Sequence, residues 1–245
     1  MRGIGTILNV AAIVIGGILG MTVGKRMKKQ LQETLKSVLG ITTMFLGAGG
    51  AFSKMLAFNG EAIQVQGSMM LIMSLTLGAL IGEWIDLDGR FEAFGRWLRH
   101  KSKSDGDSLF IDGFVISSLT VCIGAMAIIG AIEDGISGNY SILAAKAVLD
   151  LVIVMVLSAS LGKGCMFAAI PVGIWQGLLT LLAVFLQPVF TPRALDDLSL
   201  TGNVMIFMVG LNLIREERIR VANLLPGLLV SVLWAFIPWL NESVT

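Results

Sequence analysis

The sequence predicts an all-α polytopic membrane helix bundle of about eight transmembrane helices. Composition is the first observation behind this fold class, since 55% of the 245 residues are hydrophobic and only 14% are charged, against about 25% charged in a soluble domain. The second is a series of apolar runs long enough to cross a bilayer, which takes about 20 residues. The third is the shortness of the linkers, which makes residues 1–245 a single integral membrane domain.

Eight apolar segments follow one another along the chain. We expect spans at roughly 5–24, 40–57, 67–84, 112–133, 142–162, 166–187, 200–215 and 221–240. The first is not a cleaved signal peptide, because its dense basic cluster follows the apolar run instead of preceding it. If segment 166–187 is re-entrant, the C-terminal half takes the opposite orientation.

Positive charge orients the bundle. All Lys and Arg residues fall in segments 25–37, 85–111, 163–165 and 215–220 except Arg2, Lys54, Lys146 and Arg193. Cytoplasmic loops carry an excess of Lys and Arg, so these segments are expected inside and both termini outside, in the periplasm. The external turns are acidic, with Glu61, Glu133, Asp134, Asp196, Asp197 and Glu242.

Two linkers on the cytoplasmic side are expected to be interfacial helices, because apolar residues recur at helical spacing among basic ones. The basic residues are Lys25, Arg26, Lys28 and Lys29 after the first span, and Arg90, Arg96 and Arg99 after the third. Such a helix lies in the headgroup plane and is attracted to anionic lipid; a solvated linker is the alternative. Segment 192–200 is expected as a further, acidic external piece with Pro192 near a helix start.

Small residues recur four positions apart, which lets helix backbones approach closely in lipid. They are Gly16, Gly20 and Gly24; Ser74, Gly78 and Gly82; Ser158 and Gly162; and Gly227 and Ser231. Apolar runs around Gly47, Gly124 and Gly210 share a short pattern that indicates repeated helix pairs, with spans 1–3 and 6–8 related by inverted topology, a recurrent transporter plan. Ordinary glycine-rich membrane composition is the alternative. The glycine-rich faces also favour a homo-oligomer.

Asp150 is the foremost candidate for chemistry. It lies about seven residues into the fifth span, roughly 10 Å along the helix axis, where a carboxylate is costly without a partner or a task. Lys146 lies one turn earlier on the same face. The functional reading is a polar cavity in which Asp150 binds a cation or a proton and Lys146 is its counter-charge. A local pair that only orients the helix is the alternative.

Other polar residues are weaker candidates for an ion or proton pathway. Asn9, Asn203 and Asn212 lie inside spans and are secondary candidates to line it, although such amides often form interhelical hydrogen bonds worth about 0.6 kcal/mol. Lys54, Glu133 and Asp134 lie near the outer ends of two spans and are expected to form an external mouth that attracts cations. Ordinary end charges that extend toward water are the alternative.

Several classes of function are disfavoured by what the sequence lacks. His100, the single histidine, lies in a charged loop, and Cys122 and Cys165 lie in apolar runs, so neither a metal site nor a cofactor is expected. The sequence shows no nucleophile–base pair that would indicate an enzyme, and it shows no Walker-type loop that would indicate nucleotide binding. A net charge of +1 without a basic aromatic stripe argues against nucleic acid.

Three blocks of sequence resemble a known family. They are GTILNVAAIVIGGILG near the start, GAMAIIGAIEDGISGNY followed by KAVLD in the centre, and VGLNLI with IRVANLLPGLL near the end. Together they are similar to the YqgA/YdfK-like family of uncharacterised bacterial inner-membrane proteins, a domain of unknown function, over essentially the whole chain. The resemblance implies a bacterial plasma-membrane location and, through the family's description as a sodium channel or pump loosely linked to biofilm behaviour, the transport class. It supplies no functional residues.

The leading hypothesis is therefore a small-ion channel or secondary transporter, cation- or proton-coupled, in the bacterial inner membrane. Its partners would be the lipid bilayer and a small ion or small solute. The alternative is a structural or regulatory membrane protein that binds anionic lipid or a partner through its basic linkers.

Overall fold

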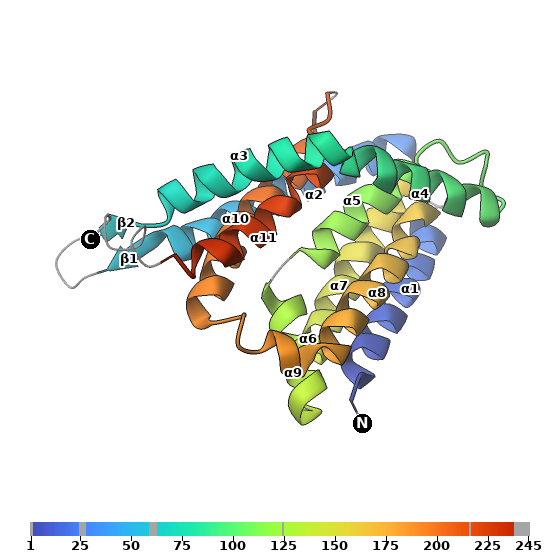
Figure 1. Cartoon of the computed structure of the whole chain (residues 1–245). Coiled ribbons are helices and arrows are strands. Elements are labelled where there is room, and N and C mark those ends of the chain that lie inside the picture. The colour runs from blue at the N-terminus through green and yellow to red at the C-terminus, as the bar shows by residue number, and fades with distance from the viewer. Residues whose placement is uncertain (1, 25–27, 59–62, 124, 216, 238–245) are drawn as a thin grey trace.

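A computed structural model of the chain describes residues 2–24, 28–58, 63–123, 125–215 and 217–237. The chain is an all-α polytopic bundle, as the sequence predicts. Figure 1 shows two groups of helices side by side, one around α1, α7 and α8 and the other around α2, α3, α10 and α11, with α4 across one end. The only pair of strands among the described residues is short.

The described elements have the following bounds. The α-helices are α1 (Ile4–Gly24), α2 (Lys29–Met55), α3 (Ser68–Ile85), α4 (Leu87–Lys101), α5 (Phe110–Cys122), α6 (Ala125–Ser137), α7 (Ser141–Leu161), α8 (Ala169–Leu181), α9 (Ala183–Leu186), α10 (Pro192–Asn212) and α11 (Pro226–Trp234). Two 3₁₀ helices, η1 (Lys163–Ala168) and η2 (Val221–Leu224), precede α8 and α11. Strands β1 (Leu56–Phe58) and β2 (Ile63–Val65) pair antiparallel, with Leu56 opposite Val65.

Six helices in the described part of the chain are long and apolar enough to cross a membrane, or seven if a bent pair counts as one span. The predicted number of eight is therefore not confirmed. Segment 166–187 overlaps a candidate span, Lys163–Leu181, which includes η1. The last predicted span, 221–240, is represented by the shorter apolar helix Val221–Trp234.

The fourth predicted span is the bent pair. Helix α5 ends at Cys122, α6 starts at Ala125, and their axes differ by 62°. Ile123 has an extended backbone conformation, with φ −81° and ψ 118°, which interrupts the helical hydrogen-bond ladder. The prediction of one continuous helix over 112–133 is wrong, because hydropathy stays high through the break and carries no trace of it. Gly124 lies outside the described residues.

Two segments that the sequence predicts as separate helices are the first turns of longer ones. They are the basic linker after the first span and residues 192–200. Residues 29–39 belong to α2, whose 27 residues give a length of about 40 Å, more than the roughly 30 Å of a hydrocarbon core. Residues 192–200 likewise belong to α10, where Pro192 occupies the first turn and Thr191 Oγ1 accepts a hydrogen bond from the Ala194 N–H at 3.2 Å. The hydropathy pattern does not show that α2 and α10 begin before the predicted spans, because their first turns carry charged residues.

Small residues bring the helices together as predicted, but the partners are distant in sequence. Helix α1 packs along α7, α2 along α10, and α3 along α11. In α1, Gly16, Gly20 and Gly24 face the α7 carbonyl oxygens of Leu151, Met155 and Ala159 so closely that a Cβ at any of the three would overlap them. Close backbone approach is what stabilises helix association in lipid, so this stripe fixes how deeply α1 lies against α7.

The two groups of helices meet in a shared apolar core at the α4 end of the molecule. Phe114 of α5 is fully buried and stacks on Phe91 of α4, with ring centroids 6.2 Å apart. Gly164 packs against the Phe110 backbone. The described parts of the four segments predicted to share the cytoplasmic side lie together at this end (Figure 1). Large apolar side chains elsewhere are exposed, among them Trp84, Leu181 and Phe45, which is the surface that a bilayer covers.

Candidate functional site

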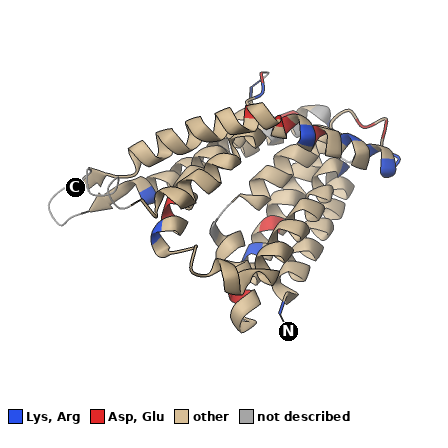
Figure 2. Cartoon of the chain, viewed as in Figure 1, with Lys and Arg blue, Asp and Glu red and all other residues tan. Residues whose placement is uncertain are grey.

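The predicted pair of α7 is formed and buried. Lys146 Nζ lies 2.5 Å from Asp150 Oδ2, and the two residues are only 7% and 3% exposed. Residues four apart in a helix lie on one face, so α7 itself holds the two groups in contact. Figure 2 shows most other described charges at the ends of the helices or in loops. Lys146 and Asp150 therefore form a buried ion pair inside the bundle, away from most of the other described charges.

The Lys146 ammonium also binds the backbone where the helix breaks. Its Nζ donates to the Val121 carbonyl oxygen at 2.9 Å. Val121 lies in the last turn of α5, whose carbonyls have no intrahelical N–H partner. Non-helical backbone at membrane depth is tolerated where it is buried in protein or lines water. The break and the charged pair thus form one site, because the break frees the oxygen that Lys146 binds.

Two amides from neighbouring helices complete the site. Asn9 of α1 and Gln176 of α8 are both fully buried, and Asn9 Nδ2 donates to Gln176 Oε1 at 3.2 Å. Asn9 also interacts electrostatically with Asp150. Asn9 Oδ1 and Gln176 Nε2 have no hydrogen-bond partner among the described residues. Four helices, α1, α5, α7 and α8, therefore converge on one polar centre.

The Lys146 ammonium binds two oxygens at this centre, one from the Asp150 carboxylate and one from the Val121 backbone. Carboxylate, carbonyl and amide oxygens are the ligands that hard cations prefer. The pair is neutral overall, which lowers the cost of burying it, although removing one partner of a buried ion pair typically costs about 3–5 kcal/mol. In the described conformation both charges are shielded from solvent.

The other predicted pathway residues lie elsewhere. Asn203 Nδ2 donates to the Ser199 carbonyl oxygen at 2.8 Å, and its side chain packs on Gly50 of α2. Asn212 binds both backbone groups of Ile219, accepting from its N–H at 2.8 Å and donating to its carbonyl at 2.7 Å. Both amides thus have structural partners, and Asn9 is the predicted asparagine that interacts electrostatically with Asp150.

The residues predicted to form an external mouth are in different surroundings. Asp134 is fully buried and caps α1, accepting from the Gly3 N–H at 3.1 Å and from the Gly5 N–H at 3.0 Å. Glu133 accepts from Asn139 Nδ2 at 3.2 Å near the surface. Lys54 of α2 forms an ion pair with Asp196 of α10 at 2.5 Å. Asp134 stabilises the positive N-terminus of a helix instead of standing in solvent.

The described residues of the predicted basic linkers lie toward the surface. Lys28 and Arg90 are exposed, and Arg96 forms an ion pair with Glu92 at 3.3 Å. Arg99 is half-buried. Lys25 and Arg26 lie outside the described residues, as do Glu61 and Glu242, and only the backbone of Lys29 is described. Helix α4, which carries three of these arginines, is amphipathic as predicted.

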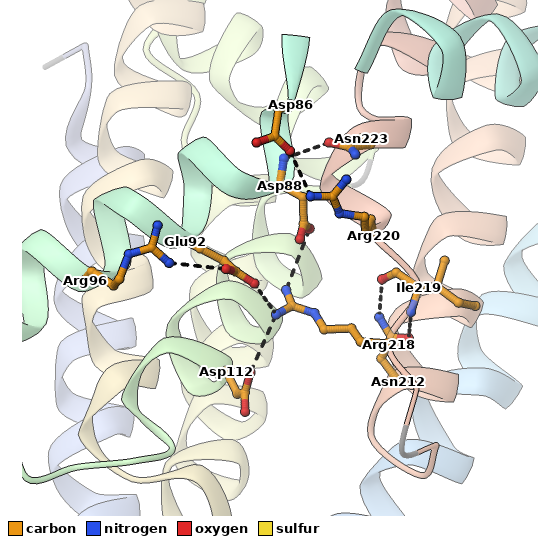
Figure 3. Close-up of polar contacts among 10 residues, drawn as sticks. All are labelled: Asp86, Asp88, Glu92, Arg96, Asp112, Asn212, Arg218, Ile219, Arg220 and Asn223. Carbon is orange, nitrogen blue, oxygen red and sulfur yellow. Dashed lines mark hydrogen bonds and ion pairs between the residues drawn. The ribbon is translucent and has the colours of Figure 1, made fainter. Parts of the chain in front are cut away.

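A second polar cluster was not predicted from the sequence. Arg218, in the segment between α10 and η2, lies among three carboxylates of α4 and α5 (Figure 3). The distances are 3.8 Å to Asp88, 3.3 Å to Glu92 and 3.5 Å to Asp112. The partners are more than a hundred positions from Arg218, so no local pattern in the sequence marks them. We call these four residues the Arg218 cluster.

Further contacts reinforce this junction (Figure 3). Arg220 binds Glu83 at 2.8 Å and Asp86 at 2.9 Å, and the Asp88 N–H donates to Asn223 Oδ1 at 2.7 Å. Burial raises the pKa of the Asp88 carboxyl above its ordinary value, and the Arg218 charge opposes part of that rise. Glu83 raises the pKa of the Arg220 guanidinium. The segment after α10 is thereby tied to the α3–α4 corner.

Comparisons with known proteins cover nearly the whole chain. The model of a family described as "Protein of unknown function (DUF554)" matches residues 4–236. An uncharacterized membrane protein, YdfK of Bacillus subtilis, is 28% identical over 233 residues, 95% of this chain and 96% of its own length. An uncharacterized protein, YqgA of Escherichia coli, is also 28% identical over 233 residues, 94% of each chain. No solved structure matches significantly.

Proposed function

Because the chain belongs to the DUF554 family of membrane proteins, whose description assigns no activity, we propose its function from the site itself. The protein is a small-ion channel or secondary transporter of the bacterial inner membrane, and it is cation- or proton-coupled. Asp150 is the ligand or proton site, Lys146 its counter-charge, and Asn9 the secondary liner.

One observation carries this proposal: a buried lysine–aspartate pair binds a free carbonyl at a helix break inside a membrane bundle. Charges within spans are costly and mark ion pathways and proton relays. Discontinuous helices with coordinating carbonyls are a recurrent feature of transporter sites. A pair with only an orienting role needs neither the break nor the amides of α1 and α8.

The proposal includes an orientation. The end of the molecule that holds α4 and the Arg218 cluster faces the cytoplasm, because the linkers there carry most of the positive charge. Both termini are then periplasmic, and Glu133 remains the surface carboxylate of the predicted mouth. The inverted repeats and the homo-oligomer stay predictions.

Ion flux into proteoliposomes tests the function. Purified protein is expected to carry sodium, potassium or protons down an imposed gradient, and Asp150→Asn is expected to reduce that flux by at least tenfold. Asp196→Asn is the matched control, because Asp196 belongs to the exposed ion pair with Lys54, and it should leave flux unchanged. The absence of flux of any of these ions, or of chloride, contradicts the proposal.

A second candidate function rests on α4. This helix places Phe94 and Trp97 in a stack, with ring centroids 5.7 Å apart, and both residues are exposed. Aromatic side chains beside Arg90 and Lys101 suit an anionic membrane surface.

As a regulatory membrane protein, the chain would retain anionic phospholipid through α4. Co-purified lipid should then shift from anionic to zwitterionic species in Arg90→Gln/Lys101→Gln, and an unchanged composition argues against it.

A further inference from the structure

We infer that a polar pocket at the N-terminal end of α1 is the outer entrance to the Asp150 site, and that a partly hydrated monovalent cation binds there first. The inference rests on the proposed function and deepens it, because it names the substrate class, the side of access and the lining residues. This end of the bundle lies opposite α4 (Figure 1), so the proposed orientation places it on the periplasmic side.

The pocket lies between the start of α1 and the helices α6, α8 and α9. Its volume is about 400 Å³, which leaves room for several water molecules of about 30 Å³ each. Part of its lining is glycine, and at Gly3 and Gly177 an added Cβ would meet nothing within 4 Å. The absence of side chains on α8 at Gly177 therefore helps to keep this space open.

Two threonine hydroxyls line the pocket without a partner in the described part of the chain. Thr6 of α1 is only 8% exposed and Thr180 of α8 is half-buried, and Oγ1 of each is buried without a hydrogen bond. A threonine in a helix commonly bonds back to the preceding turn, as Thr22 does to the Leu19 carbonyl at 2.7 Å. Buried hydroxyls are nearly always satisfied, so these two are available to water or to a cation.

Unpartnered polar atoms continue from the pocket toward the charged pair. Asn9 follows Thr6 by three residues on α1, and Gln176 precedes Thr180 by four on α8, so each amide shares a helix face with one hydroxyl. Asn9 Oδ1 and Gln176 Nε2 also lack partners among the described residues. Because Asn9 interacts electrostatically with Asp150, two successive turns of α1 and α8 connect the pocket to the Asp150 carboxylate.

The barrier between the pocket and Asp150 is thin. Asn9 and Gln176 are fully buried, and they are joined by a hydrogen bond of 3.2 Å, a type of link between helices that contributes little in lipid. On the α4 side of the pair, Val154 and Phe114 are fully buried in the apolar core. The described conformation is therefore closed toward the cytoplasmic end by packed side chains and toward the pocket by an amide pair.

The chemistry of the pocket suits a monovalent cation. Thr6 and Thr180 supply neutral oxygens, which can replace part of a hydration shell, as carbonyl oxygens do in potassium channels. Calcium and magnesium sites use carboxylates, and the nearby Asp134 carboxylate already caps α1. Arg2 at the rim donates to the Ile136 carbonyl at 3.2 Å, and its charge offsets that of Asp134. An entrance without net charge binds a cation weakly enough to pass it on.

Filling the pocket is the direct test. Gly177→Leu places a side chain in open space, so it should reduce cation flux into proteoliposomes at least tenfold without lowering the midpoint of thermal unfolding. Gly49→Leu on α2 is the matched control, because a Cβ there also meets nothing within 4 Å and Gly49 does not line the pocket. It should leave flux unchanged. Native flux in folded Gly177→Leu overturns the inference and leaves the proposed function intact.

Thiol labelling tests the side of access and does not depend on flux. Thr6→Cys is placed in a chain with Cys122→Ala and Cys165→Ala, and a membrane-impermeant quaternary-ammonium methanethiosulfonate is added to right-side-out and inside-out membrane vesicles. We expect labelling in right-side-out vesicles at least tenfold faster than for Ile13→Cys, since Ile13 of α1 is fully buried in the apolar core. Equal rates, or labelling of Thr6→Cys in inside-out vesicles alone, overturn the inference.

A third variant separates a pathway hydroxyl from a structural one. Thr6→Val keeps the shape of the side chain, so it should leave the thermal-unfolding midpoint unchanged while reducing cation flux. Thr22→Val, on the same helix but exposed, should leave flux unchanged. A lower midpoint with native flux in Thr6→Val would make the hydroxyl structural and contradict the inference.

Folding and function are controlled separately. Size-exclusion profiles establish the folding of each variant, and if the cysteine-free chain does not fold, the comparison of Gly177→Leu with Gly49→Leu still decides. A native protein that carries no cation overturns the proposed function and this inference together, even if Thr6→Cys is labelled.

Discussion

At the residue scale, the buried pair of α7 combines a stability cost with the functional role that we propose for it. Lys146 and Asp150 neutralise each other, and each has a further partner, the Val121 carbonyl and the Asn9 amide. Loss of one member leaves an uncompensated charge, whereas loss of both leaves a cavity that apolar groups can fill. Stability and transport should therefore respond differently to single and double substitutions.

This difference gives the first prediction. Asp150→Asn should lower the free energy of unfolding by about 3–5 kcal/mol, because it leaves the Lys146 ammonium buried without its carboxylate. The double variant Lys146→Met/Asp150→Leu should recover most of that loss while transport stays abolished. Thermal unfolding of the detergent-solubilised variants, with flux measured on the same preparations, checks both. A double variant that transports normally would reduce the pair to a structural role.

Asp88 gives a pH prediction at the same scale. Its pKa is raised above the ordinary value of 3.8, chiefly by burial, so the folded state binds its proton more tightly than the unfolded state does. The stability from this group is fully present below the ordinary value and is lost as pH rises through the folded pKa. Asp88→Asn should flatten this part of the stability profile above pH 3.8, as measured by thermal unfolding. Asp105→Asn, in an exposed loop, should preserve the native slope.

At the element scale, the α1–α7 contact depends on the absence of side chains. Gly20 faces the Met155 carbonyl of α7, and a Cβ there would overlap that oxygen and approach Ser158 to 2.8 Å. Since both are parts of a packed helix, neither can give way easily. Gly49 of α2 is the natural comparison, because a Cβ there meets nothing within 4 Å.

Gly20→Ala is therefore expected to destabilise the protein by about 1–3 kcal/mol, the usual cost of overpacking. Gly49→Ala should leave stability unchanged or raise it by up to about 1 kcal/mol, because alanine is the better helix former. Thermal unfolding of the two single variants under one condition decides the matter. Equal effects of the two substitutions would mean that close approach of α1 and α7 is not what the glycines provide.

At the scale of the whole molecule, the Arg218 cluster joins elements that lie far apart in the chain. The segment after α10 reaches α4 and α5 through one guanidinium and three carboxylates. Asp88 is nearly fully buried there, so the loss of Arg218 leaves it poorly compensated. The cluster holds α10 and η2 against the corner where α4 meets the rest of the bundle.

Arg218→Gln should lower the free energy of unfolding by about 1–3 kcal/mol, the range for loss of a partner to a buried charged group. Amide hydrogen exchange should become faster in α4 and in residues 217–223, while the core of α7 stays protected. Arg215→Gln is the matched control, because Arg215 is exposed in the same segment. Uniformly faster exchange over the whole chain would show general unfolding instead of a local junction.

The sequence by itself determined what depends on local periodicity and composition. Long apolar runs predict an all-α membrane bundle, glycines four apart predict closely packed helices, and an i,i+4 spacing predicts the contact between Lys146 and Asp150. The same signals misjudged the continuous span over 112–133 and the starts of α2 and α10. Hydropathy reports which residues lipid can surround, and it does not report where the backbone ladder breaks or continues.

Only the tertiary structure decided which distant groups meet. Four features join distant residues. The break brings the Val121 carbonyl to Lys146 over 25 positions, Asn9 pairs with Gln176 over 167, the cap that Asp134 makes on α1 spans about 130, and the Arg218 cluster spans 106 or more. Such contacts depend on how whole helices pack. The sequence therefore identified the charged pair, and the fold supplied the oxygens that make it a candidate ion site.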